Sequence, residues 1–188
     1  MKVTKTFQFT LVLKKVHEHT LDLEDSLYEA GCDDALINFR NRAVYLDFDR
    51  EAKTLEEAVI SAIKDVQSSS IDAEVASVAP ENWVTESEIA QRLTMTKQTV
   101  SLWISGQRRK SFPHPIMHLA KKSPLWSWSE VVNWLFENKI IDDKELVENA
   151  LFFANINAAL EERDGKARAL RHRLLKKISC QAVHRTNK

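Results

Sequence analysis

The chain has 188 residues, with 27 basic and 27 acidic side chains, three glycines, four prolines, two cysteines and five tryptophans. This length indicates one or two domains, and a hydrophobic fraction of 44% excludes wholesale disorder. Cys32 and Cys180 are too few for a disulfide framework and do not have the spacing of a metal-binding pair. No apolar run approaches the ~18 residues of a membrane span, and residues 1–10 lack the apolar core of a secretory signal. The sequence therefore predicts a soluble, cytoplasmic protein with no membrane partner.

The zero net charge conceals an asymmetry along the chain. Residues 1–81 carry nine basic and sixteen acidic side chains. Residues 82–139 carry eight and four, and residues 140–188 carry ten and seven. These counts predict an acidic N-terminal module followed by basic modules suited to a polyanion.

The first eighty residues alternate between strand and helix patterns. Apolar residues recur with a period of two in the expected strands and of three to four in the expected helices. The expected elements are a strand at 7–13, a helix at 21–30, strands at 35–39 and 44–48, a helix at 54–66 and a strand at 73–78. This order predicts an α+β, ferredoxin-like (βαββαβ) domain over residues 1–80, with four antiparallel strands and both helices on one face. We expect this domain to mediate assembly or sensing.

Two short helices are expected after a joint at Pro80-Glu81-Asn82. Thr85 and Glu88 form a capping box that opens the first helix. After a short break, Thr96 caps a second helix that ends at Gly106. Two helices separated by three residues form the helix-turn-helix pattern.

The segment after these helices is expected to form a basic wing. Each proline in Phe112-Pro113-His114-Pro115 keeps the preceding residue extended. Residues 116–119 and 125–128 are expected to pair as a β-hairpin, and Ser129 to begin a closing helix. The whole domain is expected to span residues 83–139.

Residues 88–103 (EIAQRLTMTKQTVSLW) resemble the core of a bacterial helix-turn-helix. With the Phe-Pro-His-Pro segment and residues 126–135 (WSWSEVVNWL), the chain over about 83–137 resembles AlpA-like, excisionase and MerR-type winged modules. The resemblance implies DNA binding, with the second helix in the major groove and the wing against the backbone or minor groove. Thr94 departs from the pattern, because the family usually has glycine at the turn. A threonine with positive φ there would cost roughly 1–2 kcal/mol.

The resemblance places the DNA contacts on the second helix and the wing. Glutamine pairs bidentately with adenine, and lysine or arginine donates to guanine. The base-reading candidates are Thr96, Lys97, Gln98, Thr99, Ser101 and Arg108. Wing and phosphate contacts fix the register without reading sequence. The phosphate and wing candidates are Arg109, Lys110, His114, Lys121 and Lys122.

The remaining residues with chemical potential have structural interpretations. Four tryptophans (Trp103, Trp126, Trp128 and Trp134) are spaced as core residues of the winged module. Cys32 is expected to be a buried free thiol whose pKa is raised by Asp33 and Asp34. The acidic residues of this region are expected to form a solvent-facing edge: Asp33, Asp34, Asp47, Asp49 and Glu51. Neither a clustered metal-ligand set nor a nucleophile–base pair is found, so no metal, no cofactor and no enzyme activity are expected.

Residues 142–178 are expected to be helical, with a break at Asp164-Gly165 and a frayed tail at 179–188. An apolar seam with alternating spacings of four and three is typical of a dimerisation helix. Its members are Leu146, Ala150, Phe153, Asn157 and Leu160. A further apolar stripe, Ala167, Leu170, Leu174 and Ile178, is surrounded by basic residues.

The function expected from these features is a sequence-specific DNA-binding transcriptional regulator of bacterial or phage origin. It would act as a homodimer on an inverted-repeat operator in double-stranded DNA, as a repressor or autoregulator, with a protein partner for the N-terminal domain. One alternative is an excisionase-like accessory protein that bends DNA in recombination. Another is an antitoxin-like protein that binds a protein partner and autoregulates its operon.

Overall fold

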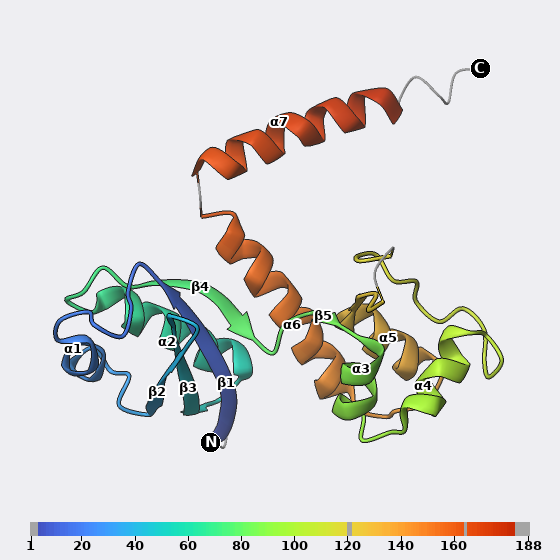
Figure 1. The fold of residues 1–188 in the computed structure, drawn as a ribbon, viewed down its shortest axis with the longest axis horizontal. Helices are drawn as coiled ribbons and strands as arrows, with labels where there is room; N and C mark the ends of the chain where they lie inside the picture. Colours follow the sequence, from blue (N-terminus) through green and yellow to red (C-terminus); the bar gives the residue numbers. More distant parts are fainter. Residues whose placement is uncertain (1–3, 120–121, 164, 183–188) are drawn as a thin grey trace.

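The computed structural model describes residues 4–119, 122–163 and 165–182. Over these residues it has mixed α+β structure, with seven helices, a four-stranded antiparallel sheet and a two-stranded sheet. The larger sheet with its two helices lies at one end of the molecule, and three short helices lie at the other end (Figure 1). The expected α+β class and the four-stranded antiparallel sheet are confirmed.

The N-terminal unit alternates strands and helices in the expected order. Its elements are β1 (Lys5–Lys14), α1 (Leu23–Glu29), β2 (Ala35–Arg40), β3 (Ala43–Ala52), α2 (Leu55–Ser68) and β4 (Glu74–Ala79). The strand order is β2-β3-β1-β4, with every neighbouring pair antiparallel. Thr54 begins α2 by accepting a hydrogen bond from the Glu57 backbone N–H, as its sequence predicts.

The two faces of this sheet differ in polarity because its strands alternate. On one face Leu11 lies opposite Leu46 and Phe9 opposite Phe48, whose rings stack with centroids 5.2 Å apart. Buried residues of α1 and α2 join this apolar face in a single core, so both helices cover the same side. The opposite face is polar: Thr10 Oγ1, for example, donates to Asp47 at 2.6 Å.

A second core forms around the central part of the chain. Its elements are β5 (Trp83–Val84), α3 (Glu86–Arg92), α4 (Lys97–Ile104), β6 (Trp126–Ser127) and α5 (Trp128–Glu137). The expected hairpin between 116–119 and 125–128 is wrong in extent, because it is reduced to one bridge between Met117 and Leu125. Instead, β6 pairs with β5, a strand that we did not predict. The physical reason is that Ser127 caps α5, so the chain enters the helix at Trp128 rather than continuing a wing strand.

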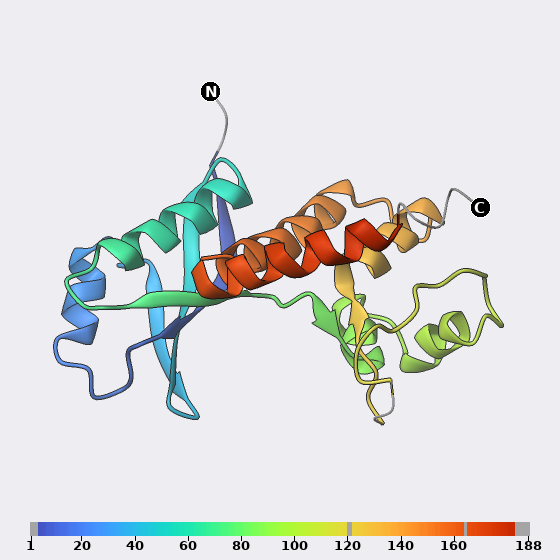
Figure 2. The same ribbon diagram turned by 90° about the horizontal axis from the view of Figure 1, so that it is seen from above.

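Helix α6 (Lys144–Glu161) contributes to both cores and lies between the two units (Figure 2). Leu146 and Ala150 pack into the central core, whereas Phe153 and Leu160 are buried in the N-terminal core. Asn157 is hydrogen-bonded to β4. The expected dimerisation seam of Leu146, Ala150, Phe153, Asn157 and Leu160 is therefore wrong, because these side chains are occupied within one chain.

Asn157 closes the β4 edge of the larger sheet. Its Oδ1 accepts a hydrogen bond from the Val78 backbone N–H at 2.7 Å, and its Nδ2 donates to the Val78 carbonyl at 2.8 Å. One side-chain amide thus satisfies both polar groups of a strand residue, as a neighbouring strand would do. At Val78 the outer edge of β4 is therefore closed to another strand.

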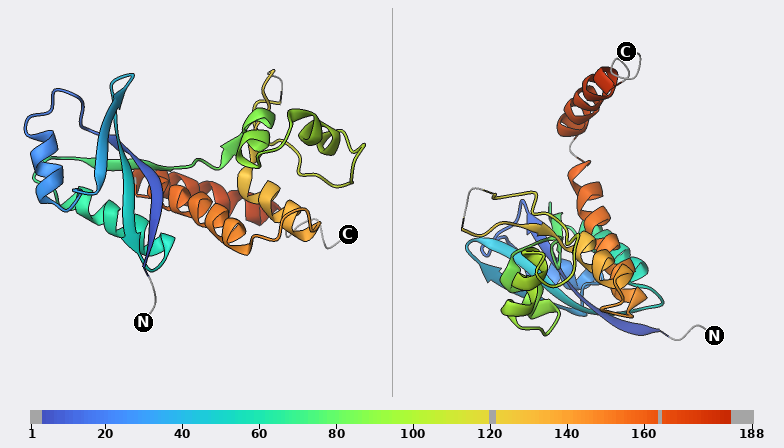
Figure 3. Two further views of the ribbon diagram at one scale, coloured as in Figure 1. Left: turned by 90° about the horizontal axis from the view of Figure 1, so that it is seen from below. Right: turned by 90° about the vertical axis from the view of Figure 1, so that its right-hand side faces the viewer.

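Helix α7 (Gly165–Ala182) follows α6 at the expected break and projects from the body of the molecule (Figure 3). It extends through residues 179–182, which we expected to be frayed, while 183–188 lie outside the described residues. Among the described helices, none is long and apolar enough to cross a membrane.

Replacing Asn157 with alanine tests the contribution of α6 to the N-terminal unit. The change leaves the part-buried Val78 N–H and carbonyl without their partner, so we expect the free energy of unfolding to fall by about 1–3 kcal/mol. Urea unfolding followed by circular dichroism measures this difference. The control is Asn155→Ala on the same helix, where the exposed Asn155 amide bonds only to the Leu151 carbonyl of α6. Equal losses for both variants would contradict the role given to Asn157.

Candidate nucleic-acid interface

Helices α3 and α4 pack together through small and apolar side chains. Ile89, Ala90 and Val100 are buried between the helices and the rest of the central core, and Trp103 is only 3% exposed. Thr85 caps α3 through a reciprocal capping box, in which the Glu88 carboxylate accepts from the Thr85 backbone N–H at 2.7 Å. This hydrogen bond lowers the pKa of Glu88, so the cap is fully formed at neutral pH.

The outward face of α4 is polar and carries three of the predicted base-reading residues. Lys97, Gln98 and Ser101 are exposed on this helix, opposite the buried Val100 and Trp103. Their long or hydroxylated side chains can donate and accept hydrogen bonds in a groove of DNA.

Thr96 and Thr99 have a different role in the structure. Thr96 Oγ1 accepts from the Thr99 backbone N–H at 3.2 Å and lies 2.9 Å from Thr99 Oγ1. These two predicted base-reading residues therefore form the N-terminal cap of α4. Their hydroxyls orient the helix start beside Lys97 and Gln98.

The turn between α3 and α4 contains a strained residue. Thr94 has a φ of +53°, in the left-handed region that favours glycine. The turn is nevertheless formed, since the Thr94 N–H donates to the Gln91 carbonyl and the Met95 N–H donates to the Ala90 carbonyl. Thr94 thus adopts the left-handed conformation for which glycine is the favoured residue.

The loop after α4 carries the other predicted contacts. Arg108, Lys110, His114 and Lys122 are exposed, whereas Lys121 lies outside the described residues. Arg109 differs from them, because its Nη1 donates to the Asn138 carbonyl at the end of α5, 3.0 Å away. This contact ties the loop to α5, so Arg109 helps to hold the neighbouring cations in place.

Buried aromatic side chains pack beside this loop and fix part of it. The rings of Trp103, Phe112 and Trp134 form a triangle with centroid separations of 5.0–6.3 Å. The Trp126 indole N–H donates to the Pro113 carbonyl at 3.1 Å, which fixes the Phe-Pro-His-Pro segment. Trp103, Trp126, Trp128 and Trp134 are all buried, so their predicted role in the core is confirmed.

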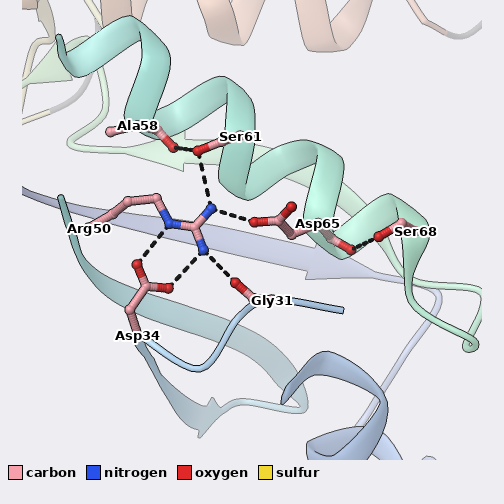
Figure 4. A network of polar contacts seen from close by, with 7 residues as sticks. All are labelled: Gly31, Asp34, Arg50, Ala58, Ser61, Asp65 and Ser68. Atoms are coloured by element: carbon pink, nitrogen blue, oxygen red, sulfur yellow. Dashed lines mark hydrogen bonds and ion pairs between the residues drawn. The ribbon is translucent and has the colours of Figure 1, made fainter. Parts of the chain in front are cut away.

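A second polar cluster lies in the N-terminal unit, around the buried Arg50 (Figure 4). Its guanidinium donates to both oxygens of Asp34, to Asp65, to Ser61 and to the Gly31 carbonyl, at 2.5–3.2 Å. Burial alone would lower the pKa of Arg50, but the hydrogen bonds to Asp34 and Asp65 raise it above its ordinary value. All five guanidinium hydrogens are used, so this cluster joins α2 to the strands and leaves no donor for a ligand.

The Arg50 cluster corrects part of the sequence interpretation. Asp34 is not part of a solvent-facing acidic edge, because it pairs with Arg50, whereas Asp33, Asp47, Asp49 and Glu51 are exposed. A sequence signal was present: Arg50 has the same strand parity as the buried Val44, Leu46 and Phe48. A charge at an apolar position predicts a buried partner.

Cys32 is a buried free thiol, as expected. Burial raises its pKa to about 12, and the carboxylate of Asp65 contributes more than those of Asp34 and Asp33. The thiol is therefore protonated and unreactive at neutral pH. In the described part of the chain, no group of three or more acidic, histidine or cysteine side chains is arranged to hold a metal ion.

The chain was compared with known proteins at the level of families, curated sequences and solved structures. No family model matches it, and neither the curated proteins nor the solved structures include a match. Conclusions about its function therefore rest on its own residues.

Replacing Thr94 with glycine should stabilise the protein by about 1 kcal/mol. The substitution relieves a left-handed strain of roughly 1–2 kcal/mol, part of which is offset by the greater entropy of glycine in the unfolded chain. Thermal and urea unfolding measure the change. Gly106→Ala is the matched control: Gly106 has a φ of +69° and open space around its missing side chain, so alanine there should destabilise by a similar amount. A Thr94→Gly variant that is less stable than the unmodified protein would contradict the strain assigned to Thr94.

Removing the Arg50 charge should be strongly destabilising. In Arg50→Met the carboxylates of Asp34 and Asp65 lose their shared partner, and we expect the free energy of unfolding to fall by about 3 kcal/mol. A matched control is Arg42→Met, at an exposed position of the β2–β3 turn, which should change stability by less than about 0.5 kcal/mol. Both are measured by urea unfolding at pH 7. Similar effects of the two substitutions would contradict a structural role for the cluster.

Proposed function

We propose that this protein is a sequence-specific regulator that binds double-stranded DNA through residues 83–139. In this proposal the central unit is a winged helix-turn-helix module, α4 is its recognition helix and the loop after α4 is its wing. The observation that carries the proposal is the division of α4 into two faces. Val100 and Trp103 fix the helix on α3 and the aromatic core, while Lys97, Gln98 and Ser101 stay exposed.

The size and chemistry of α4 fit the major groove. With its side chains an α-helix is about 10–12 Å across, which matches the width of about 12 Å of the major groove of B-form DNA. Gln98 has the amide needed for a bidentate pair with adenine, and Lys97 can donate to guanine. The first turn of α4 has no acidic residue that would repel the DNA backbone.

The charges around α4 support an orientation in which α4 and the loop after it face the DNA. Arg108, Lys110 and Lys122 are exposed in the loop after α4, where they can neutralise phosphates and fix the register. The N-terminal unit is acidic and would be repelled by the backbone, so it would lie away from the DNA. We assign this unit to the ferredoxin-like fold on the basis of its strand order and its two helices on one face, with a role in assembly.

The proposal predicts a base-specific effect of Gln98. Gln98→Ala should weaken binding to the preferred sequence by about 1–3 kcal/mol and relax the choice of base at one position. Selection from a random DNA pool identifies the preferred sequence, and fluorescence anisotropy at a fixed salt concentration measures the affinity. Lys110→Ala should instead weaken binding to all sequences and reduce the salt dependence by about one counterion.

The control for this experiment is Gln8→Ala, on the polar face of the N-terminal sheet, which should leave DNA binding unchanged. If Gln98→Ala binds every sequence as the unmodified protein does, α4 is not the recognition helix. If no sequence is enriched and binding disappears steeply with salt, the protein binds DNA without sequence specificity.

A further inference from the structure

Helix α7 presents an apolar stripe that the described residues of the chain leave exposed. Leu170, Leu174, Leu175 and Ile178 are between 45% and 68% exposed and lie on one side of the helix. Figures 1 and 3 show α7 standing clear of the sheet and of helices α1 and α2. Exposed leucines and isoleucine on one long helix mark an interaction surface.

The charges on α7 itself are all positive, and one of them, Arg171, pairs with Glu161 and Glu162 at the end of α6. The sequence of α7 contains no acidic residue, and its six lysines and arginines are Lys166, Arg168, Arg171, Arg173, Lys176 and Lys177. Two such helices from different copies would repel each other if they packed side by side. The complementary surface must instead be acidic, with apolar side chains to receive the stripe.

The N-terminal unit has a surface of this kind. Two neighbouring hollows between α1 and β2 share Glu24 and Asp25 of α1. The carboxylates that line them come from α1 and from the loops on either side of it, namely Glu18, Asp22, Glu24, Asp25 and Asp33. Two large side chains are exposed beside them, Tyr28 at 67% and Phe39 at 41%. Leu36, which is 66% exposed, lies on the opposite face of β2, because it pairs with Asp47 of the polar face. We call this surface the α1–β2 groove.

The groove also lies at the uncovered edge of the sheet. The strand order makes β2 and β4 the two edge strands, and α6 covers β4 through Asn157. In the part of the chain that the structure describes, β2 pairs with β3 and with no other strand. An edge with exposed leucine and phenylalanine is a surface that proteins ordinarily cover.

We propose that α7 of one copy docks in the α1–β2 groove of a second copy. The apolar stripe of α7 would cover Tyr28 and Phe39, and flanking cations such as Arg173 and Lys177 would pair with the carboxylates of the groove. The docking occurs between copies because α1 and the free end of α7 lie at opposite ends of the molecule (Figure 1). Two such contacts related by a two-fold axis close a dimer.

This dimer differs from the one expected from the sequence. It uses α7 rather than the buried seam of α6, and it leaves the outward face of α4 free. It does not depend on DNA binding, because the contact joins two protein surfaces outside the central unit. DNA is a poorer partner for α7, because phosphates would pair with the cations but leave the apolar stripe exposed.

The test is a charge exchange read by light scattering on the full chain without DNA. At low salt, the unmodified protein should have twice its chain mass of 21.6 kDa. The groove variant (Glu24→Arg with Asp25→Arg) and the helix variant (Arg173→Glu with Lys177→Glu) should each raise the dimer dissociation constant tenfold or more. Combining all four substitutions restores opposite charges, and the dimer should return. All four positions are exposed, so the fold is expected to persist.

The control variant carries Glu51→Arg and Glu56→Arg, which change the net charge equally on exposed positions outside the groove. It should remain a dimer. A monomeric unmodified protein, or dimers that persist in both charge-reversed variants, would overturn the proposal. A helix variant that keeps its mass but binds all DNA sequences more weakly would also overturn it, and would assign α7 to the DNA backbone. Loss of sequence preference in Gln98→Ala is a separate result that this experiment does not affect.

Discussion

The arrangement of the whole molecule depends on one helix that is shared between two hydrophobic cores. Ala150 and Phe153 are three residues apart on α6, yet the first is buried in the central core and the second in the N-terminal core. An α-helix is stiff over its 18 residues, about 27 Å, so burying its two ends separately fixes the relative placement of the two units. The Asn157 amide adds directionality, because it bonds to both backbone groups of Val78 only when α6 lies along β4.

This constraint determines which surfaces remain free. Covering β4 leaves β2 as the sheet edge beside the acidic hollow, and packing α6 on α5 leaves the outward face of α4 exposed on the central unit. The charge asymmetry follows the same division, since the acidic residues concentrate on the N-terminal unit and the cations on the α4 loop and α7. Opposite charges at separate places within one chain are the basis of the contacts that we propose with DNA and with a second copy.

Most local features could be predicted from interactions between residues that are close in the sequence. The caps formed by Thr85 and Thr96 were predicted because a hydroxyl three residues before a free backbone N–H can satisfy it. The four antiparallel strands followed from the period-two pattern, since one face of each strand had to be buried. Arg50 was not identified as buried, because a strand pattern shows which face a residue occupies but not which distant carboxylates meet it there. Asp34 and Asp65 reach Arg50 from a loop and from α2.

The sequence by itself determined the element order of the N-terminal unit, the α+β class, the turn at Thr94 and the apolar seam of α6, because each is set by neighbours within a few residues. Only the tertiary structure decided what that seam contacts. An apolar stripe on a helix must be buried, but its periodicity is the same whether the partner is a second copy or another part of the same chain. Here two cores of the same chain bury the seam of α6, whereas the stripe of α7 stays exposed among the described residues. The β5–β6 pairing was likewise decided by packing, since strands of two residues are too short to leave a pattern in the sequence.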